Sequence, residues 1–237
     1  MVNEAKRIVG FSGAGISTES GIPDFRSPNG IWAKNRTVMF QEFMASYDDR
    51  VEYWRQKVAI WPEMKKAIPN DGHHFFVKID KEGKLLGLIT QNIDNMHQKS
   101  GLRENKIVEL HGTLKNVVCL SCGVKISMDE ALKRVEAGEL APQCLICGGF
   151  LKPATVSFGQ SLSENDLTYA FNLCSECDLF IAVGSSLVVQ PAAGFPVLAK
   201  NNGAKLVIIN RTETCLDSIA DLVIHDGIGK TLQALLS

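Results

Sequence analysis

A glycine-rich turn early in the chain has the residue types that bind a phosphorylated cofactor. Residues 13–26 read GAGISTESGIPDFR and directly follow a short apolar run at residues 8–11. Gly13 and Gly15 have no Cβ, so the backbone can bend sharply there and bring N–H groups close to a pyrophosphate. The spacing differs from the usual dinucleotide fingerprint, because five residues separate Gly15 from Gly21. These glycines alone therefore predict a cofactor turn without identifying the cofactor.

Other side chains add chemistry to this turn. Asp24, Phe25 and Arg26 place an acid, an aromatic ring and a guanidinium beside the predicted cofactor. His111 follows an apolar run and precedes Gly112, so we expect its side chain to face a site rather than the core. A histidine titrates near neutral pH and suits proton transfer. His111 is therefore the candidate general base.

Four cysteines have the spacing of a closed metal site. Two Cys-x-x-Cys pairs lie 21 residues apart, and their members are Cys119, Cys122, Cys144 and Cys147. Four thiolates can surround zinc tetrahedrally, and such a site is structural because no position remains for water or substrate. The spacing disfavours the alternative of four unrelated buried cysteines. We therefore predict one structural zinc ion.

A third pair, Cys174 and Cys177, lies at the end of a helical stretch. Redox sensing and an accessory metal are the functional alternatives for this pair. Packing of the helix is the interpretation that we favour, because unpaired cysteines are commonly buried.

The elements that must position these residues alternate along most of the chain. We expect strands at residues 8–11, 85–90, 106–110, 179–183, 205–209 and 221–224. We expect helices at residues 71–79, 92–99, 164–173, 192–202 and 229–236. This alternation predicts an α/β fold, a Rossmann-like parallel sheet with helices on both faces, plus a small inserted zinc-ribbon and helical domain. Ligands bind such sheets at the carboxyl ends of the strands, where the glycine turn and His111 are expected.

The composition limits the possible classes of function. The chain has 237 residues, 45% of them hydrophobic and 22% charged, which fits one soluble domain with a small insertion. The net charge of −1 argues against general affinity for nucleic acid, and the N-terminus shows no signal-peptide pattern. Residues 179–199 are uncharged, but their glycines and prolines favour a strand, a loop and a helix start over a membrane span. Seven cysteines, four in metal-like spacing, suggest a reducing compartment and hence a cytoplasmic protein.

Four segments together resemble the sirtuins, a family of NAD-dependent protein-lysine deacylases. They are residues 13–26, 90–94 (TQNID), 110–113 (LHGT) and 184–192 (GSSLVVQPA). They follow the family's order, and the two zinc-type cysteine pairs lie between the last two. The resemblance implies that the acyl oxygen of a modified lysine attacks C1′ of the nicotinamide ribose of NAD, and that nicotinamide leaves. A base and water then complete the release of lysine and O-acyl-ADP-ribose.

The resemblance also implies roles for particular residues. His111 would be the general base, with Asn92 and Asp94 binding nicotinamide, although both residue types also cap helices. Phe25 would cover the site that nicotinamide leaves. The implied cofactor contacts are Gly13, Ala14, Gly15, Ser17, Asp24, Phe25, Arg26, Gln91, Asn92, Ile93, Asp94, His111, Gly184, Ser185, Ser186, Asn210 and Ile228.

Residues 152–160 correspond to the family's substrate groove, where an acyl-lysine peptide is expected to pair with the protein backbone. Val156 and Gly159 are the expected backbone partners, and Phe158 is the expected wall of the acyl-lysine tunnel. The family more often has a bulkier residue at Ser157 and a glutamate at Gln160, so the peptide preference stays open.

The resemblance implies three regions in the chain. Residues 1–32, 72–118 and 152–237 would form the NAD-binding domain. Residues 33–71 would form a cofactor loop and a helical module, and residues 119–151 the zinc module.

Several alternatives stay open. An ADP-ribosyltransferase or NAD hydrolase could use the same fold, and so could a silent module that binds NAD or acyl-lysine. A zinc-ribbon adaptor for nucleic acid is disfavoured by the low net charge. Tyr47 and Arg50 have the spacing of a pair that selects acidic acyl groups in some sirtuins, but we expect a neutral acyl chain. The oligomeric state cannot be predicted from the sequence.

Overall fold

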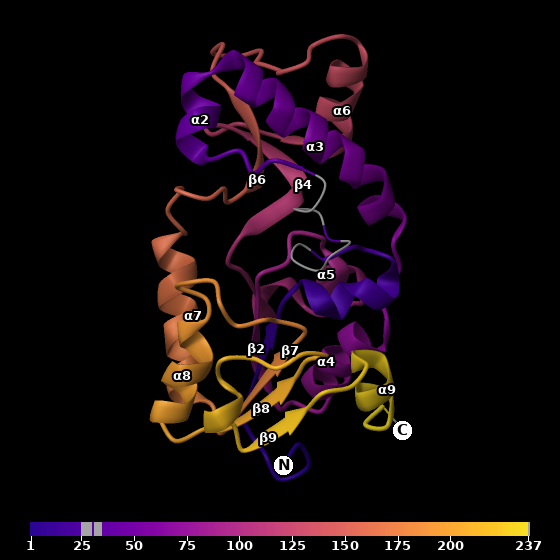
Figure 1. The fold of residues 1–237 in the computed structure, drawn as a ribbon, viewed down its shortest axis with the longest axis vertical. Coiled ribbons are helices and arrows are strands. Elements are labelled where there is room, and N and C mark those ends of the chain that lie inside the picture. The colour runs from indigo at the N-terminus through magenta and orange to yellow at the C-terminus, as the bar shows by residue number, and fades with distance from the viewer. Residues whose placement is uncertain (25–29, 31–34, 237) are drawn as a thin grey trace.

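The computed structural model describes residues 1–24, 30 and 35–236. Its larger part is a six-stranded sheet with the order β3-β2-β1-β7-β8-β9, in which all neighbouring strands are parallel (Figure 1). The strands are β1 (Ile8–Ser12), β2 (Leu85–Thr90), β3 (Ile107–Glu109), β7 (Leu179–Val183), β8 (Lys205–Ile209) and β9 (Leu222–Ile224). The predicted parallel sheet is therefore confirmed.

Helices cover both faces of this sheet. One face packs against α4 (Asp71–Lys81) and α9 (Ile228–Gln233), and the other against α7 (Glu164–Glu176) and α8 (Gly194–Asn201). Side chains of β1 alternate between the two sides, as a strand requires. Ile8 joins the core beneath α4, whereas Val9 joins the core beneath α7. A Cβ at Gly10 would come within 2.4 Å of the Phe76 ring, so the absence of a side chain there lets α4 pack closely.

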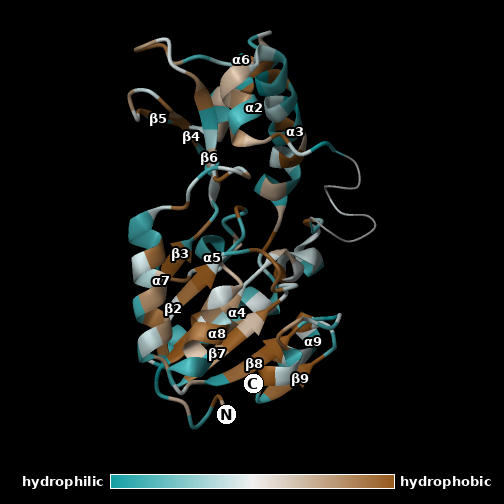
Figure 2. Ribbon diagram, turned by 60° about the vertical axis from the view of Figure 1, so that its left-hand side comes forward, coloured by the Kyte–Doolittle hydropathy of each residue, from teal (hydrophilic) through white to brown (hydrophobic). Residues whose placement is uncertain are grey.

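A smaller lobe lies beyond the carboxyl ends of the large sheet (Figures 1 and 2). It contains α2 (Phe40–Ala45), α3 (Tyr47–Lys66), β4 (Gly112–Cys119), β5 (Lys125–Ser127), α6 (Met128–Glu136) and β6 (Leu151–Thr155). The three strands form an antiparallel sheet with the order β5-β4-β6. Trp54 of α3 is buried and donates its indole N–H to the carbonyl of Leu151 at 3.2 Å. The helical module and the cysteine-bearing strands therefore pack as one lobe.

The helix expected at residues 92–99 is shorter than predicted, because α5 comprises only Met96–Lys99. Asn95 has a left-handed backbone with φ of 62°, and Asp94 Oδ1 accepts a hydrogen bond from Met96 N at 3.0 Å. Asn92 and Asp94 therefore precede the helix. The remaining elements are short 3-10 helices at Ala14–Ser20, Glu104–Lys106 and Asp217–Ile219.

The uncharged stretch at residues 179–199 divides between β7, a loop and the first six residues of α8. Among the described residues, no helix is both long enough and apolar enough to cross a bilayer.

Candidate functional site

A cavity of about 1030 Å³ lies between the carboxyl ends of the large sheet and the smaller lobe. Its lining brings together most of the cofactor and substrate residues predicted from the sequence. They are Gly13, Ala14, Gly15, Asp24, Gln91, Asn92, Ile93, His111, Val156, Phe158, Gly159, Gly184, Ser185, Ser186, Asn210 and Ile228. Ser17 and Asp94 lie buried behind this lining. Phe25 and Arg26 fall outside the described residues.

Two turns that follow neighbouring strands support each other at the floor of the cavity. Gly15 N donates to Gly184 O at 2.9 Å, and Gly13 N donates to Val183 O at 3.0 Å. Gly184 has φ of 62°, and a Cβ there would come within 2.3 Å of Ile16 N. Only glycine fits this close approach without strain. The glycine turn is thus held in shape by contacts within the protein.

A buried polar network is centred on Ser17, in the glycine turn that follows β1. Ser17 Oγ donates to Asp94 Oδ2 at 2.7 Å and accepts from Asn92 Nδ2 at 3.3 Å. His73 Nδ1 accepts from Asn70 N at 3.2 Å, so its Nε2 carries the proton and donates to Ser17 Oγ at 3.3 Å. Burial raises the pKa of Asp94. The network therefore fixes the side chains of Asn92 and Asp94 beside the cavity.

Two histidines near this network are held neutral by their surroundings. Burial, with a smaller contribution from His74, lowers the pKa of His73 to about 3. Burial also lowers the pKa of His97 well below its usual value, with a smaller contribution from His73. His97 Nε2 lies 2.9 Å from Ser12 Oγ, which itself donates to Thr90 Oγ1 at 2.8 Å. These histidines pack beneath the site.

His111 lies between β3 and β4, on the wall of the cavity. Its Nδ1 lies 3.0 Å from the carbonyl oxygen of Gln91, which can only accept a hydrogen bond. Nδ1 therefore carries the proton, and Nε2 is the basic atom of the neutral ring. The backbone carbonyl of His111 accepts from Val156 N at 2.8 Å. This geometry suits a general base whose ring is oriented by the backbone.

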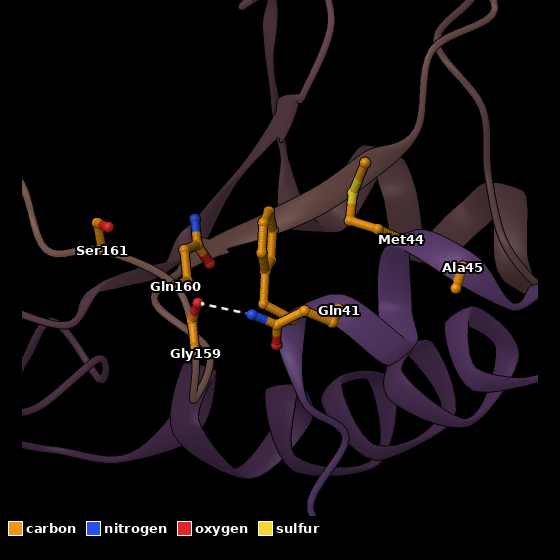
Figure 3. Close-up of a pocket in the computed structure, with 7 residues that line it drawn as sticks. Gln41, Met44, Ala45, Gly159, Gln160 and Ser161 are labelled. Atoms are coloured by element: carbon orange, nitrogen blue, oxygen red, sulfur yellow. Dashed lines mark hydrogen bonds between the residues drawn. The ribbon is translucent and has the colours of Figure 1, made fainter.

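The predicted substrate segment is anchored to the smaller lobe. Phe40 N donates to Phe158 O at 2.9 Å, and Gln41 Nε2 donates to Gly159 O at 3.3 Å (Figure 3). Gln160 Oε1 accepts from Ser157 N at 3.2 Å, so the amide at this position closes a turn. Phe158 is 43% exposed.

Three residues of the cavity wall on α3, Tyr53, Gln56 and Lys57, were not predicted from the sequence. Tyr53 and Lys57 are one helical turn apart and both line the cavity. Burial opposes ionisation of Tyr53, but nearby Lys57 and Lys152, with two hydroxyl hydrogen bonds, lower the pKa of its phenol to about 8. The i, i+4 spacing of Tyr53 and Lys57 was the available signal. Tyr47, which the sequence analysis considered, is instead 56% exposed.

Glu19 is a further cavity residue that sequence reasoning missed. Both of its carboxylate oxygens accept from Gly229 N at 3.1 Å, which joins the glycine turn to α9. No local pattern could have indicated this, because the partner lies 210 positions away.

The four cysteines of the predicted metal site converge at the ends of β4 and β6. All four Sγ atoms of Cys119, Cys122, Cys144 and Cys147 lie within 4.8 Å of one another. The Sγ atoms of Cys119 and Cys147 are 3.5 Å apart, and those of Cys122 and Cys144 are 3.7 Å apart. Thiolates bound to zinc at about 2.3 Å in a tetrahedron would be roughly 3.8 Å apart. The donor set and its spacing therefore fit one zinc ion.

The third cysteine pair has a different environment. Cys174 and Cys177 are buried in the core beneath α7 and α8, and burial raises the pKa of both thiols. This environment fits the packing role that the sequence analysis favoured.

Comparisons with known proteins agree along the chain. Residues 13–191 match the model of the Sir2 family. An NAD-dependent protein deacetylase of Rhodopseudomonas palustris is 52% identical over 98% of this chain and 92% of its own length. An NAD-dependent protein deacetylase of Thermodesulfovibrio yellowstonii is 42% identical over 100% of this chain and 91% of its own length.

Solved structures give the same result. A Sir2 structure with a p53 peptide and NAD+ is 36% identical, with a TM-score of 0.90 over 99% of this chain and 94% of that chain. A structure of Sir2Tm bound to a propionylated peptide is 35% identical, with a TM-score of 0.88 over the same shares of the two chains.

Proposed function

Since the chain belongs to the Sir2 family, we propose that it is an NAD-dependent protein-lysine deacetylase in which His111 is the general base. The observation that carries this assignment is the orientation of His111 on the wall of a cavity that the glycine turns also line. NAD, consumed as co-substrate, supplies the ADP-ribose that accepts the acyl group. The relatives' names and the bound peptides of the similar structures support the same activity.

The residues around the cavity have distinct proposed roles. Gly13 and Gly15 approach the pyrophosphate, while Gly184 holds their turn in place. Asn92 and Asp94 hydrogen-bond the nicotinamide carboxamide, from positions that the Ser17 network fixes. These contacts orient the nicotinamide ribose toward the bound acyl oxygen and promote departure of nicotinamide.

The chemistry after departure of nicotinamide needs a base. His111 Nε2 takes the proton of a ribose hydroxyl, while the hydrogen bond from Nδ1 to Gln91 O keeps the ring oriented. Val156 and Gly159 pair with the backbone of the acyl-lysine peptide, and Phe158 covers the lysine side chain.

The remaining contacts extend this assignment. The rest of the proposed cofactor surface consists of Ala14, Asp24, Gln91, Ile93, Ser185, Ser186, Asn210 and Ile228. We also assign Phe25 and Arg26 to cofactor binding, although both lie outside the described residues. We assign cofactor binding to residues 1–32, 72–118 and 152–237, with the helical module at 33–71 and the zinc module at 119–151. β4, at the end of the second range, and β6, at the start of the third, pair with each other within the smaller lobe. The cysteine usage supports a cytoplasmic location.

Nicotinamide release tests the proposal. Release from NAD should require an acetyl-lysine peptide, and the peptide should lose the acetyl mass in the same reaction. His111→Ala should lower kcat/KM at least a hundredfold, the usual contribution of a general base. His74→Ala, which changes an exposed histidine, is the matched control and should keep the activity.

Other outcomes of this assay point to the alternative functions. Nicotinamide release without peptide would indicate an NAD hydrolase or an ADP-ribosyltransferase. If neither acetyl nor longer acyl peptides give any release, the protein is a silent binding module and the proposal is wrong.

A further inference from the structure

Beneath the cavity, a series of buried hydrogen bonds begins at His97, a side chain that the proposed reaction does not use. His97 lies in α5, is 1% exposed, and places Nε2 2.9 Å from the hydroxyl of Ser12 at the end of β1. Ser12 Oγ donates to Thr90 Oγ1 at 2.8 Å, and Thr90 Oγ1 also accepts from Asn92 N at 3.1 Å. This series, here the Ser12 network of His97, Ser12 and Thr90, connects α5 to the backbone of a proposed nicotinamide contact.

The hydrogen bonds of the Ser12 network run in one direction. Thr90 takes the hydrogen of the Ser12 hydroxyl, so Ser12 Oγ accepts its other bond and His97 Nε2 carries the proton that it donates. His97 Nδ1 is then a nitrogen with a lone pair. It has no hydrogen-bond partner among the described residues, and a second ring N–H there would be buried and unpaired. Burial, with a smaller contribution from His73, lowers the pKa of His97 and agrees with a single proton on the ring.

Aromatic neighbours hold the His97 ring in this orientation. The ring packs edge to face against His73, with centroids 5.0 Å apart, and against Phe76, with centroids 5.9 Å apart. All three side chains are buried. Packing therefore fixes the donor at the start of the Ser12 network.

The Ser12 network ends at the loop that follows β2, and this loop carries residues of the proposed site. Ser12 O accepts from Gln91 N at 3.0 Å, and the Thr90 hydroxyl accepts from the next backbone N–H, that of Asn92. Gln91 O in turn accepts from His111 Nδ1. Ser12 and Thr90 therefore anchor the backbone that orients both Asn92 and the proposed base.

Asn92 is held by two separate hydrogen bonds. Its side-chain Nδ2 donates to Ser17 Oγ at 3.3 Å, and its backbone N donates to the Thr90 hydroxyl. Asn92 is 5% exposed, so a backbone N–H that lost Thr90 would be buried without a partner. The loop would shift to satisfy this N–H, and the side-chain amide of Asn92 would move with it.

We propose that His97, Ser12 and Thr90 are positioning residues for nicotinamide, because the Ser12 network sets the backbone of Asn92 and thereby the fit of its amide to the nicotinamide carboxamide. The inference rests on the proposed deacetylase function. None of the three is among the described residues that line the main cavity, so they act through Asn92 rather than by touching the cofactor.

Two variants at position 90 test the Ser12 network. Thr90→Val keeps the shape of the side chain but removes the acceptor for Asn92 N, whereas Thr90→Ser keeps the hydroxyl and removes a methyl group. Thr90→Val should lower kcat/KM for NAD and raise the inhibition constant of added nicotinamide, each about tenfold, because a misplaced Asn92 binds nicotinamide less well. The KM for the acetyl-lysine peptide should stay unchanged, and Thr90→Ser should recover most of both losses.

Variants elsewhere locate the effect. His97→Phe keeps an aromatic ring but removes the donor to Ser12, so it should change both quantities in the same direction as Thr90→Val. It decides by the same criteria if Thr90→Val does not fold, which circular dichroism shows. Leu206→Ala is the control, because Leu206 is buried at the amino end of β8 and its truncation lowers stability without touching the Ser12 network. This control should keep the inhibition constant of nicotinamide.

The outcomes separate this inference from the assignment of function. If Thr90→Val deacetylates the peptide with unchanged kcat/KM for NAD and an unchanged inhibition constant, the positioning role is wrong and the deacetylase assignment stands. Equal changes in Thr90→Val and Leu206→Ala, or no recovery in Thr90→Ser, would also overturn it, because the network would then serve stability alone. If the parent protein does not deacetylate the peptide, the proposed function fails and the inference fails with it.

Discussion

Individual residues beneath the cavity show that this site depends on side chains kept neutral. His73 and His97 are buried, and their rings lie 5.0 Å apart at 62°. Protonating either ring would place a charge where water cannot reach it. Ser17 hydrogen-bonds both His73 and Asp94, so it links the buried His73 ring to the carboxylate that contacts nicotinamide in the proposed mechanism. Stability and cofactor binding are therefore coupled at the scale of single side chains.

The histidines predict a loss of stability in acid. The pKa of His73 is about 3 in the folded protein and 6.5 in the unfolded chain, so the unfolded state binds the proton more tightly. The contribution of neutral His73 to the free energy of unfolding is complete above pH 6.5 and is lost as the pH falls from 6.5 toward 3. Between pH 7 and pH 5 the loss is about 2 kcal/mol in the free energy of unfolding. His97 acts in the same direction.

Urea unfolding at pH 7 and pH 5 measures this effect. His73→Asn should remove about 2 kcal/mol of the pH dependence, whatever it does to stability at pH 7. His74→Asn is the matched control, because His74 is the next residue of the same helix and is exposed. Equal pH dependence in the two variants would show that His73 is not protonated on unfolding.

At the scale of elements, the connection from His111 into β4 positions the general base. Gly112 begins β4 with φ of 71°, and a Cβ there would lie 2.0 Å from the carbonyl oxygen of Ala154. Glycine therefore allows β4 and β6 to approach directly beside His111. The same contact places Val156, the residue directly after β6, against the backbone of His111.

We expect Gly112→Ala to destabilise the protein by at least about 2 kcal/mol and to lower kcat, because backbone strain adds to a clash. Gly123→Ala is the control: Gly123 has φ of 75°, but no atom lies within 4 Å of a Cβ built there. That variant should lose only about 1 kcal/mol, the conformational cost alone. Urea unfolding and nicotinamide release measure both effects. Equal losses in the two variants would contradict the packing argument.

The elements differ in how far their sequences could predict them. β7 and β8 are continuous apolar runs, and the sequence analysis identified both, since a strand buried on both faces leaves that pattern. β4 mixes buried and exposed residues, and β6 contains Pro153, so neither looked like a strand. Their pairing depends on contacts between segments more than 30 positions apart. The left-handed backbone of Asn95 directly precedes α5, so this helix begins at Met96 and not at residue 92, where the sequence pattern had placed its start.

At the scale of the whole molecule, the metal site and the cofactor site belong to one connected core. Cys119 and Cys144 pack in the same cluster as Ile93, which lines the main cavity between Asn92 and Asp94. β4 joins the two sites directly, because it runs from Gly112, next to His111, to Cys119. None of the four cysteines lines the cavity among the described residues. Zinc would therefore act on catalysis only through the fold.

This connection predicts that removing zinc abolishes deacetylation and destabilises the protein. Zinc bound to four thiolates contributes to folding, and without it the ends of β4 and β6 lose their link. Cys122→Ser should lower both the zinc content and the melting temperature, and the loss of activity should follow the loss of zinc. Cys215→Ser is the matched control, because Cys215 is also exposed but lies outside the cluster. A zinc-free protein with full activity would show that the smaller lobe holds His111 in place without the metal.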